Sequence, residues 1–158
     1  MWIDLICVGK LKEDYWRAAC AEYGKRLGRY VKLQVVEVPD LPIPDRASPA
    51  QQDAIRRQEG ARMLERLPQG ARAVALDGGG EPLSSEQLAA RIGDWQMDGR
   101  TVALLIGGSL GLHADILARC DMRISMGRMT FPHQLARVMA LEQLYRGYRI
   151  LRGERYHK

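Results

Sequence analysis

The chain has 158 residues, of which 46% are hydrophobic and 27% charged, and this length suits one domain, 1–158, that folds without disulfides or a metal. Its apolar runs fall far short of the roughly 20 residues that a membrane span needs, and no secretory signal is visible, so we expect a cytoplasmic protein that uses neither a membrane nor a metal. The net charge of +5 favours a polyanionic partner, although only weakly.

Short apolar runs rich in β-branched residues alternate with runs whose apolar side chains recur at helical spacing. The predicted elements, in chain order, are strand 2–8, helix 11–27, strand 33–38, a proline-rich loop 39–49, helix 48–67, strand 71–77, helix 84–97, strand 101–107, helix 113–120, strand 122–126 and helix 132–150. Strands that are apolar on both faces and alternate with helices indicate an α/β fold. We therefore predict a mostly parallel sheet of five or six strands, with helices covering both faces.

Two helix starts carry specific capping signals. Ser48 can accept a hydrogen bond from the first turn of the next helix, and Pro49 suits the first helical position because that position needs no N–H donor. Ser84 is followed by Glu86 and Gln87, which is the pattern of a capping box. The sequence therefore predicts one helix directly after each serine.

In an open parallel sheet, ligands bind at the carboxyl ends of the strands, where the loops converge. This rule selects the loops Leu76–Gly80, Gly107–Gly111 and Met126–Phe131. The middle loop lies in the stretch LLIGGSLG. Its paired glycines can let a ligand contact the backbone, because a Cβ atom there would occupy the ligand's space. A tight turn without any ligand is the alternative interpretation.

Two common phosphate-binding motifs do not fit LLIGGSLG. A dinucleotide fingerprint requires G-x-G-x-x-G followed by a second half-fold, whereas this stretch reads G-G-S-L-G and only about 47 residues follow it. A P-loop requires Lys and then Ser or Thr after its last glycine, and Leu112 and His113 stand there. The loop is therefore expected to hold a ligand whose recognised part is not a phosphate.

The segment MTFPHQLARVMALEQLYRGYRI, residues 129–150, is the second informative stretch. Helical spacing puts His133 and Arg137 on one face, one turn apart. Further along, arginines recur at every third residue, at Arg146, Arg149, Arg152 and Arg155. Interleaved arginines and tyrosines suit phosphate contacts and stacking on unpaired bases. A solvated basic helix end is the alternative.

The stretch LLIGGSLGL, together with SMGRMTFPHQLARVMALEQLYRGYRILRGERYHK, resembles the ribosomal RNA large subunit methyltransferase H family of the SPOUT class. The opening WIDLICVGKLKEDYW and residues 73–77 fit the same family, so the likeness covers nearly the whole chain. The resemblance implies an α/β fold whose C-terminal part is threaded into a trefoil knot, and an obligate homodimer. Neither feature follows from periodicity, and knotted chains are rare.

The resemblance also implies an activity: transfer of a methyl group from S-adenosylmethionine to N3 of a pseudouridine in 23S ribosomal RNA, on assembled ribosomes. The cofactor site that it implies consists of Leu76, Gly108, Met126, Gly127, Arg128, Met129, Thr130 and Phe131. These residues lie in the three loops that strand polarity selects. A proline often follows the paired glycines in the family, whereas Ser109 stands here, so the shape of this loop can differ.

The expected chemistry requires little of the protein. A sulfonium methyl group is already activated, so catalysis consists mainly of holding it in line with the attacking nitrogen. The N3 proton must still leave, and donors near the two flanking carbonyls would stabilise the developing negative charge. By motif position, Arg137, Tyr156 and His157 are candidate donors, and His133 is the candidate proton acceptor. The candidate RNA-binding residues are Arg146, Arg149, Arg152, Arg155 and Lys158.

A homodimer packed through the last helix would let the tail of one protomer reach the pocket of the other. The apolar face available for this contact consists of Leu135, Val138, Met139, Leu141 and Tyr145. The same side chains can instead belong to the core of a single chain, and the sequence leaves these alternatives open.

Two other classes of function remain open. A non-catalytic RNA-binding module of the ribosome would bind RNA in a salt-sensitive way and would not bind S-adenosylmethionine. A small nucleotide-binding oxidoreductase would bind NADH, although the missing fingerprint weakens this interpretation. Binding measured with S-adenosylmethionine and with NADH separates the three classes.

Overall fold

The computed structural model describes residues 1–156, which form five strands and five helices. In chain order the elements are β1 (Trp2–Val8), α1 (Asp14–Leu27), β2 (Lys32–Val38), α2 (Pro49–Leu64), β3 (Arg72–Pro82), α3 (Ser85–Asp98), β4 (Val102–Ile106), α4 (Ala114–Leu117), β5 (Met122–Ser125) and α5 (His133–Leu151). The predicted alternation of strands and helices is confirmed. Within the described residues, no helix is both long and apolar enough to cross a membrane.

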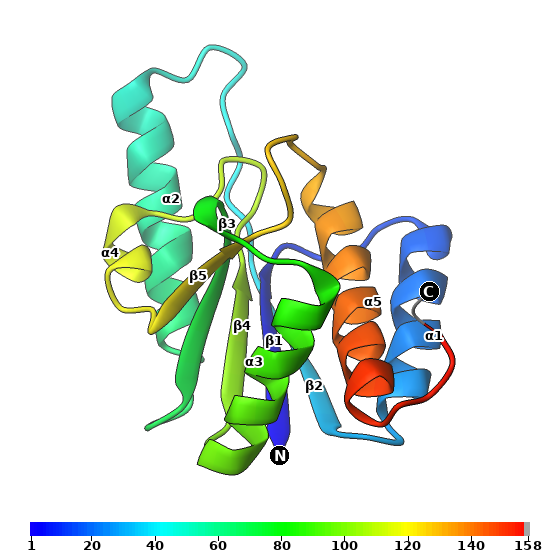
Figure 1. Cartoon of the computed structure of the whole chain (residues 1–158). Helices are drawn as coiled ribbons and strands as arrows, with labels where there is room; N and C mark the ends of the chain where they lie inside the picture. Colours follow the sequence, from blue (N-terminus) through cyan, green and yellow to red (C-terminus); the bar gives the residue numbers. More distant parts are fainter. Residues whose placement is uncertain (157–158) are drawn as a thin grey trace.

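The five strands form one sheet in the order β2-β1-β4-β3-β5, and every neighbouring pair is parallel. Parallel neighbours need crossover connections, and the helices supply them. Because all five strands run the same way, their carboxyl ends share one edge, which is the upper edge of the sheet in Figure 1. The predicted mostly parallel α/β sheet is confirmed, with five strands.

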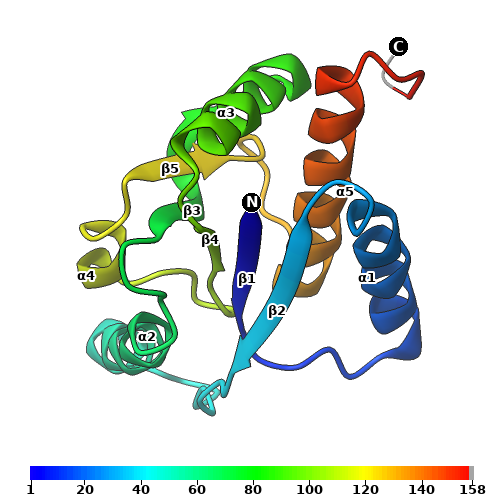
Figure 2. The same cartoon turned by 90° about the horizontal axis from the view of Figure 1, so that it is seen from below.

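Helices cover both faces of the sheet, as predicted. Figure 2 shows α1, α3 and α5 on one side and α2 and α4 on the other. The side chains of β4 alternate between the two cores: Leu104 and Ile106 pack in the first, and Ala103 and Leu105 in the second. All four are nearly inaccessible to solvent. This two-sided burial explains why the strand is apolar along its whole length.

The two predicted helix starts are confirmed in detail. Ser48 accepts a hydrogen bond from the backbone N–H of Gln51 at 3.2 Å, and the Gln51 side chain accepts one from the Ser48 N–H at 2.8 Å. Ser84 and Gln87 repeat this reciprocal pair with the same two distances. Each box satisfies two backbone donors that a helix start leaves without partners.

The third strand differs from its prediction, because it continues through the glycines that were expected to end it. β3 pairs with β5 up to Leu76, breaks register, and pairs again at Glu81 and Pro82. A Cβ atom on Gly80 would lie 2.7 Å from the backbone of Ile124, so only glycine allows this close approach. The predicted loop Leu76–Gly80 is therefore a bulge inside a longer strand.

The first helix begins at Asp14, three residues later than predicted. Leu11 is buried, but it lies in the loop before the helix. The side chain of Arg17 reaches back and donates to the carbonyls of Leu11 and Lys12, at 2.7 Å each. These bonds hold the loop in place of helical hydrogen bonds, which sequence periodicity alone does not reveal.

Candidate cofactor pocket at the strand ends

A cavity of about 250 Å³ lies at the carboxyl ends of β3, β4 and β5, where the three predicted loops meet. It is lined by Leu76, Asp77, Gly78, Ile106, Gly107, Gly108, Ser109, Gly111, Leu112, Ser125, Met126, Gly127, Arg128, Met129, Thr130, Phe131, His133 and Ala136. This strand-end pocket contains all eight residues of the implied cofactor site and also His133. The fold therefore brings together residues that are up to 57 positions apart in the sequence, from Leu76 to His133.

The paired glycines are explained by packing within the protein. A Cβ atom on Gly107 would lie 2.5 Å from the carbonyl carbon of Gly111, and one on Gly108 would lie 3.1 Å from Val8 Cγ1. The turn closes with a hydrogen bond from the Gly111 N–H to the Gly108 carbonyl, at 3.0 Å. The expectation that these two glycines spare space for a ligand is therefore wrong: their missing side chains make room for the protein itself.

Three other glycines keep the pocket open. Gly78, Gly111 and Gly127 all line it, and a Cβ atom built on any of them would meet no atom within 4 Å. Gly111 and Gly127 also have positive φ angles, 80° and 123°, which side chains rarely adopt. Their bare backbone suits a ligand that lies close to the chain, so a cofactor that is held mainly by backbone groups fits this wall.

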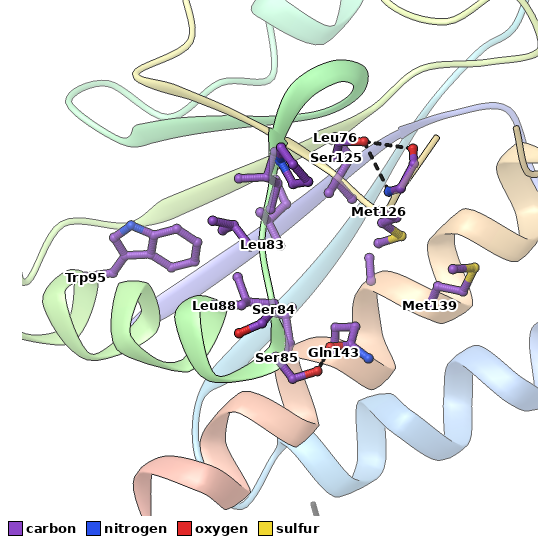
Figure 3. A pocket seen from close by; sticks show the side chains of 16 residues that line it. Leu76, Leu83, Ser84, Ser85, Leu88, Trp95, Ser125, Met126, Met139 and Gln143 are labelled. Carbon is purple, nitrogen blue, oxygen red and sulfur yellow. Dashed lines mark hydrogen bonds between the residues drawn. The ribbon is translucent and has the colours of Figure 1, made fainter. Parts of the chain in front are cut away.

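The loop after β5 is held in shape by Ser125. Its hydroxyl donates to the Gly127 carbonyl at 2.9 Å and accepts from the Gly127 N–H at 3.1 Å. These two bonds are drawn in Figure 3, and Met126 beside them packs against the core that the sheet forms with α5. The following residues are more accessible: Met129 keeps 76% of its surface exposed. A large exposed apolar side chain at the rim suits contact with a ligand or a partner.

A second cavity, of about 380 Å³, adjoins the strand-end pocket between α3, α5 and the end of β5 (Figure 3). The two cavities share Leu76, Ser125, Met126 and Gly127, which form the partition between them. Apolar side chains such as Leu88 and Met139 line most of the second cavity, and Ser85 bridges from α3 to Gln143 of α5 at 2.8 Å. Leu76 and Met126 therefore give the partition an apolar surface toward each of the two cavities.

His133, the first residue of α5, is half-buried in the wall of the strand-end pocket. A Cβ atom on Gly9 would lie 3.7 Å from His133 Cε1, so the ring packs against the bare backbone after β1. Burial, followed by the positive charge of Arg137, lowers the pKa of His133 below its ordinary 6.5, against a smaller opposing effect of Asp40 and Glu13. The imidazole is therefore neutral at neutral pH and can accept a proton.

Arg137 lies one turn further along α5, but it does not line the pocket. Its side chain is 1% exposed, and its guanidinium donates to Glu37 Oε1 at 2.5 Å and to the Gly9 carbonyl at 2.9 Å. These bonds tie α5 to the ends of β1 and β2. The predicted role as a donor to the substrate does not fit this geometry, because the guanidinium faces the protein interior. Arg137 instead holds the helix that carries His133.

The C-terminal arginines and Tyr156 lie at the other end of α5. Tyr156 packs edge-on against Tyr145 and donates to Glu142 Oε1 at 3.1 Å. Arg146 also binds Glu142, at 2.5 Å, and Arg149 forms an ion pair with Glu154 at 2.9 Å. Arg152 and Arg155 are exposed. Two further candidates, His157 and Lys158, lie outside the described residues.

Several residues of this region were missed by sequence reasoning. Ser125 and Leu112 line the pocket as direct neighbours of the selected loops, and strand polarity is the signal that finds them. Glu37 and Glu59 lie outside the three loops, and no motif singles them out. Among residues 1–156, no group of three or more His, Cys, Asp or Glu side chains is placed to hold a metal ion.

Comparison with known proteins gives the same family along the whole chain. The model of the family described as predicted SPOUT methyltransferase matches residues 1–157. Proteins named ribosomal RNA large subunit methyltransferase H from Bifidobacterium adolescentis and Clostridium kluyveri are 52% and 48% identical over 159 aligned positions. Both alignments cover 100% of this chain and 100% of the relative.

Solved structures support the fold. A putative methylase family protein from Neisseria gonorrhoeae superposes with a TM-score of 0.55 at 16% identity, covering 90% of this chain and 81% of that chain. A probable methylase family protein from Haemophilus influenzae Rd KW20 has a TM-score of 0.54 at 12% identity, covering 99% and 70%. Family model, full-length relatives and fold agree, and the chain therefore belongs to the SPOUT methyltransferases, within the ribosomal RNA large subunit methyltransferase H family.

Proposed function

We propose that this protein is an S-adenosylmethionine-dependent methyltransferase that modifies N3 of a pseudouridine in 23S ribosomal RNA on the assembled ribosome. One observation carries the proposal: the eight residues of the implied cofactor site and His133 line a single pocket at the strand ends. The names of the full-length relatives support ribosomal RNA of the large subunit as the substrate class. A ribosomal substrate in turn favours the cytoplasm as the place of action.

The residues present fit the proposed cofactor. The open backbone at Gly78, Gly111 and Gly127 suits close contact with the methionine part of the cofactor. The apolar partition at Leu76 and Met126 suits the faces of its adenine ring. When bound, the cofactor supplies an electrophilic methyl group. The surrounding backbone would hold the cofactor beside the rim formed by residues 128–130, all of which are exposed.

His133 is proposed to accept the proton that N3 loses. Its lowered pKa keeps the imidazole neutral, and its place in the pocket wall lets it face a base that enters from the rim. The N3 proton would pass to the imidazole, and the electron pair left on N3 would take the methyl group that the bound cofactor supplies. The bond from that group to sulfur would break with its electrons staying on sulfur, which leaves a neutral thioether. Arg137 contributes indirectly, because its bonds to Glu37 and Gly9 fix the first turn of α5.

We propose that the active form is a homodimer with composite sites. Tyr156 bonds Glu142, which lies nine residues after His133, or about 13 Å along the helix. Within one protomer, Tyr156 therefore lies far from the pocket. Leu141 and Tyr145 are buried in the core, whereas Leu135, Val138 and Met139 keep accessible surface for a partner.

Sedimentation tests the dimer directly. Val138→Asp should give a monomer at micromolar concentration with methyl transfer lost, since a charge would be buried at the interface. Met97→Asp is the matched control, because Met97 is 91% exposed on α3 and should leave the dimer intact. A wild-type monomer with full activity would contradict the composite site.

The SPOUT class implies a C-terminal trefoil knot, and the path of the chain supports it. The chain leaves β5 at one edge of the sheet and returns as α5, which packs against α1 and contacts β2 at the other edge through Arg137 and Glu37. Residues 126–131 must therefore pass across the strand ends, beside the turn at Gly107–Gly111. This crossing is the place where threading would occur.

Methyl transfer to ribosomes tests the function. Purified protein, labelled S-adenosylmethionine and ribosomes from a strain lacking this protein should yield label in 23S RNA, and mass mapping should place it at N3 of one pseudouridine. Free 23S RNA is the control and should accept far less label. Salt-sensitive RNA binding without methyl transfer or S-adenosylmethionine binding would instead support a non-catalytic RNA-binding module.

A further inference from the structure

Glu59 is a buried carboxylic acid directly behind the pocket wall. It lies on α2 and is 4% exposed. Its Oε1 atom accepts a hydrogen bond from the Leu41 N–H at 3.0 Å, which ties the proline-rich loop to the helix. Its Oε2 atom lies 3.4 Å from the position that a Cβ atom on Gly108 would occupy. Only the backbone of the glycine turn therefore separates this oxygen from the pocket.

This carboxyl group has no cationic partner among the described residues. Arg62, one turn further along α2, donates to the Pro39 carbonyl at 2.9 Å and influences Glu59 only at longer range. Burial raises the pKa of Glu59; the hydrogen bond from the Leu41 N–H opposes this rise, and nearby Asp40 adds to it. A buried carboxylate is costly unless a positive charge compensates it. Because residues 1–156 supply none in contact, a cationic ligand in the adjoining pocket is the natural counterpart.

We propose that Glu59 is a specificity-determining residue, which makes the pocket prefer a cationic sulfonium ligand over its neutral thioether counterpart. The inference rests on the proposed function, in which the ligand is S-adenosylmethionine and the product is S-adenosylhomocysteine. The two molecules differ by one methyl group and one positive charge at sulfur. A carboxylate behind Gly108 attracts the first through the thin backbone wall and gives the second no such advantage.

This preference serves turnover. Methyl transfer removes the positive charge at sulfur, so the attraction to Glu59 ends when the reaction is complete. The product then leaves more readily, and it competes less with the next cofactor molecule. The backbone contacts of the pocket are the same for both ligands, so they cannot supply this discrimination by themselves.

Calorimetry on the purified protein with each ligand tests the proposal. For Glu59→Gln, which keeps the shape and removes the charge, the affinity for S-adenosylmethionine should fall about tenfold. The affinity for S-adenosylhomocysteine should stay within about twofold, since that ligand lacks the charge. Glu59→Asp keeps the charge and should retain most of the preference. The stoichiometry of S-adenosylhomocysteine binding counts correctly folded sites in each preparation.

Glu65→Gln is the matched control. Glu65 is an exposed acid that caps the C-terminal end of the same helix, remote from the strand ends. It should leave both affinities unchanged. An equal loss for both ligands in Glu59→Gln, or no loss for either, would overturn the proposal while the cofactor site stands. A wild-type protein that binds neither ligand would overturn the proposed function as well.

Discussion

The two ends of α5 differ in how much of their function one chain provides. At the first end, His133 lines the strand-end pocket together with the loops after β3, β4 and β5 of its own chain. At the other end, Tyr156 packs against Tyr145 of α5, and Tyr30 donates to Glu154 at 2.7 Å. Neither Tyr156 nor the C-terminal arginines line that pocket. The first end therefore lies at the strand-end pocket, whereas the candidate catalytic residues at the second end lie away from that pocket.

This difference suggests a division of labour. Cofactor binding should require one chain only, whereas methyl transfer should require the tail of a second chain. Affinity for S-adenosylmethionine and turnover on ribosomes should therefore respond to different substitutions.

Removal of residues 153–158 should abolish methylation, by about a thousandfold or more, while the affinity for S-adenosylmethionine stays within about twofold. The reason is that the described part of the tail, residues 153–156, does not line the pocket of its own chain. Label transfer to ribosomes and calorimetry measure the two properties. Arg155→Ala should act in the same direction. Unchanged turnover by the truncated protein would remove the tail from the mechanism.

Mixing two inactive variants sharpens this prediction. Tail-truncated protein combined with a Gly107→Ala variant should regain up to about a quarter of wild-type turnover, because half of the reassorted dimers would contain one complete site out of two. No recovery after confirmed subunit exchange would show that pocket and tail act within one chain.

Gly107→Ala should lower the affinity for S-adenosylmethionine by about a hundredfold, because the new Cβ atom would lie 2.5 Å from Gly111 and force the turn open. Ser109→Ala is the control in the same loop: its side chain is exposed, and the affinity should change less than twofold. Calorimetry measures both variants. If Gly107→Ala binds normally, the shape of this turn does not matter for the pocket.

Glu37→Gln should reduce the free energy of unfolding by about 2 kcal/mol, since it leaves the buried guanidinium of Arg137 without a counter-charge. The value is at the low end for a buried pair because Glu37 is 32% exposed. Urea unfolding measures the change. Glu22→Gln removes an exposed partner of Arg26 and should cost far less. Equal effects would mean that the Arg137 pair does not anchor α5.

The pH profile tests His133. Its pKa is lowered below 6.5, so turnover should stay constant down to about that pH and then fall up to tenfold per unit as the imidazole gains a proton. His133→Asn should flatten this acid limb. The sign for stability is the same: the unfolded chain binds the proton more readily, so stability falls as pH drops below 6.5. If turnover still falls at low pH in His133→Asn, the fall is caused by the titration of another group.

Local sequence patterns predicted most of the fold because their causes are local. The capping boxes at Ser48 and Ser84 involve residues three positions apart, and the alternation of strands and helices follows from side-chain periodicity. Strand polarity and the family motif together indicated the three loops that line the strand-end pocket. The pattern did not reveal the extension of β3, because the glycines that looked like a stop allow contact with β5, 44 residues away at Ile124.

By itself, the sequence determined the α/β class, the capped starts of α2 and α3 and the positions of the three loops along the chain, since these depend on neighbours in the sequence. Only the tertiary structure decided the directions of the side chains. It packed other protein atoms where side chains on Gly107 and Gly108 would lie. It also buried Arg137 between Glu37 and Gly9, and it placed Glu59 behind the pocket wall. Such contacts join residues tens of positions apart, and periodicity holds no information about which of them will meet.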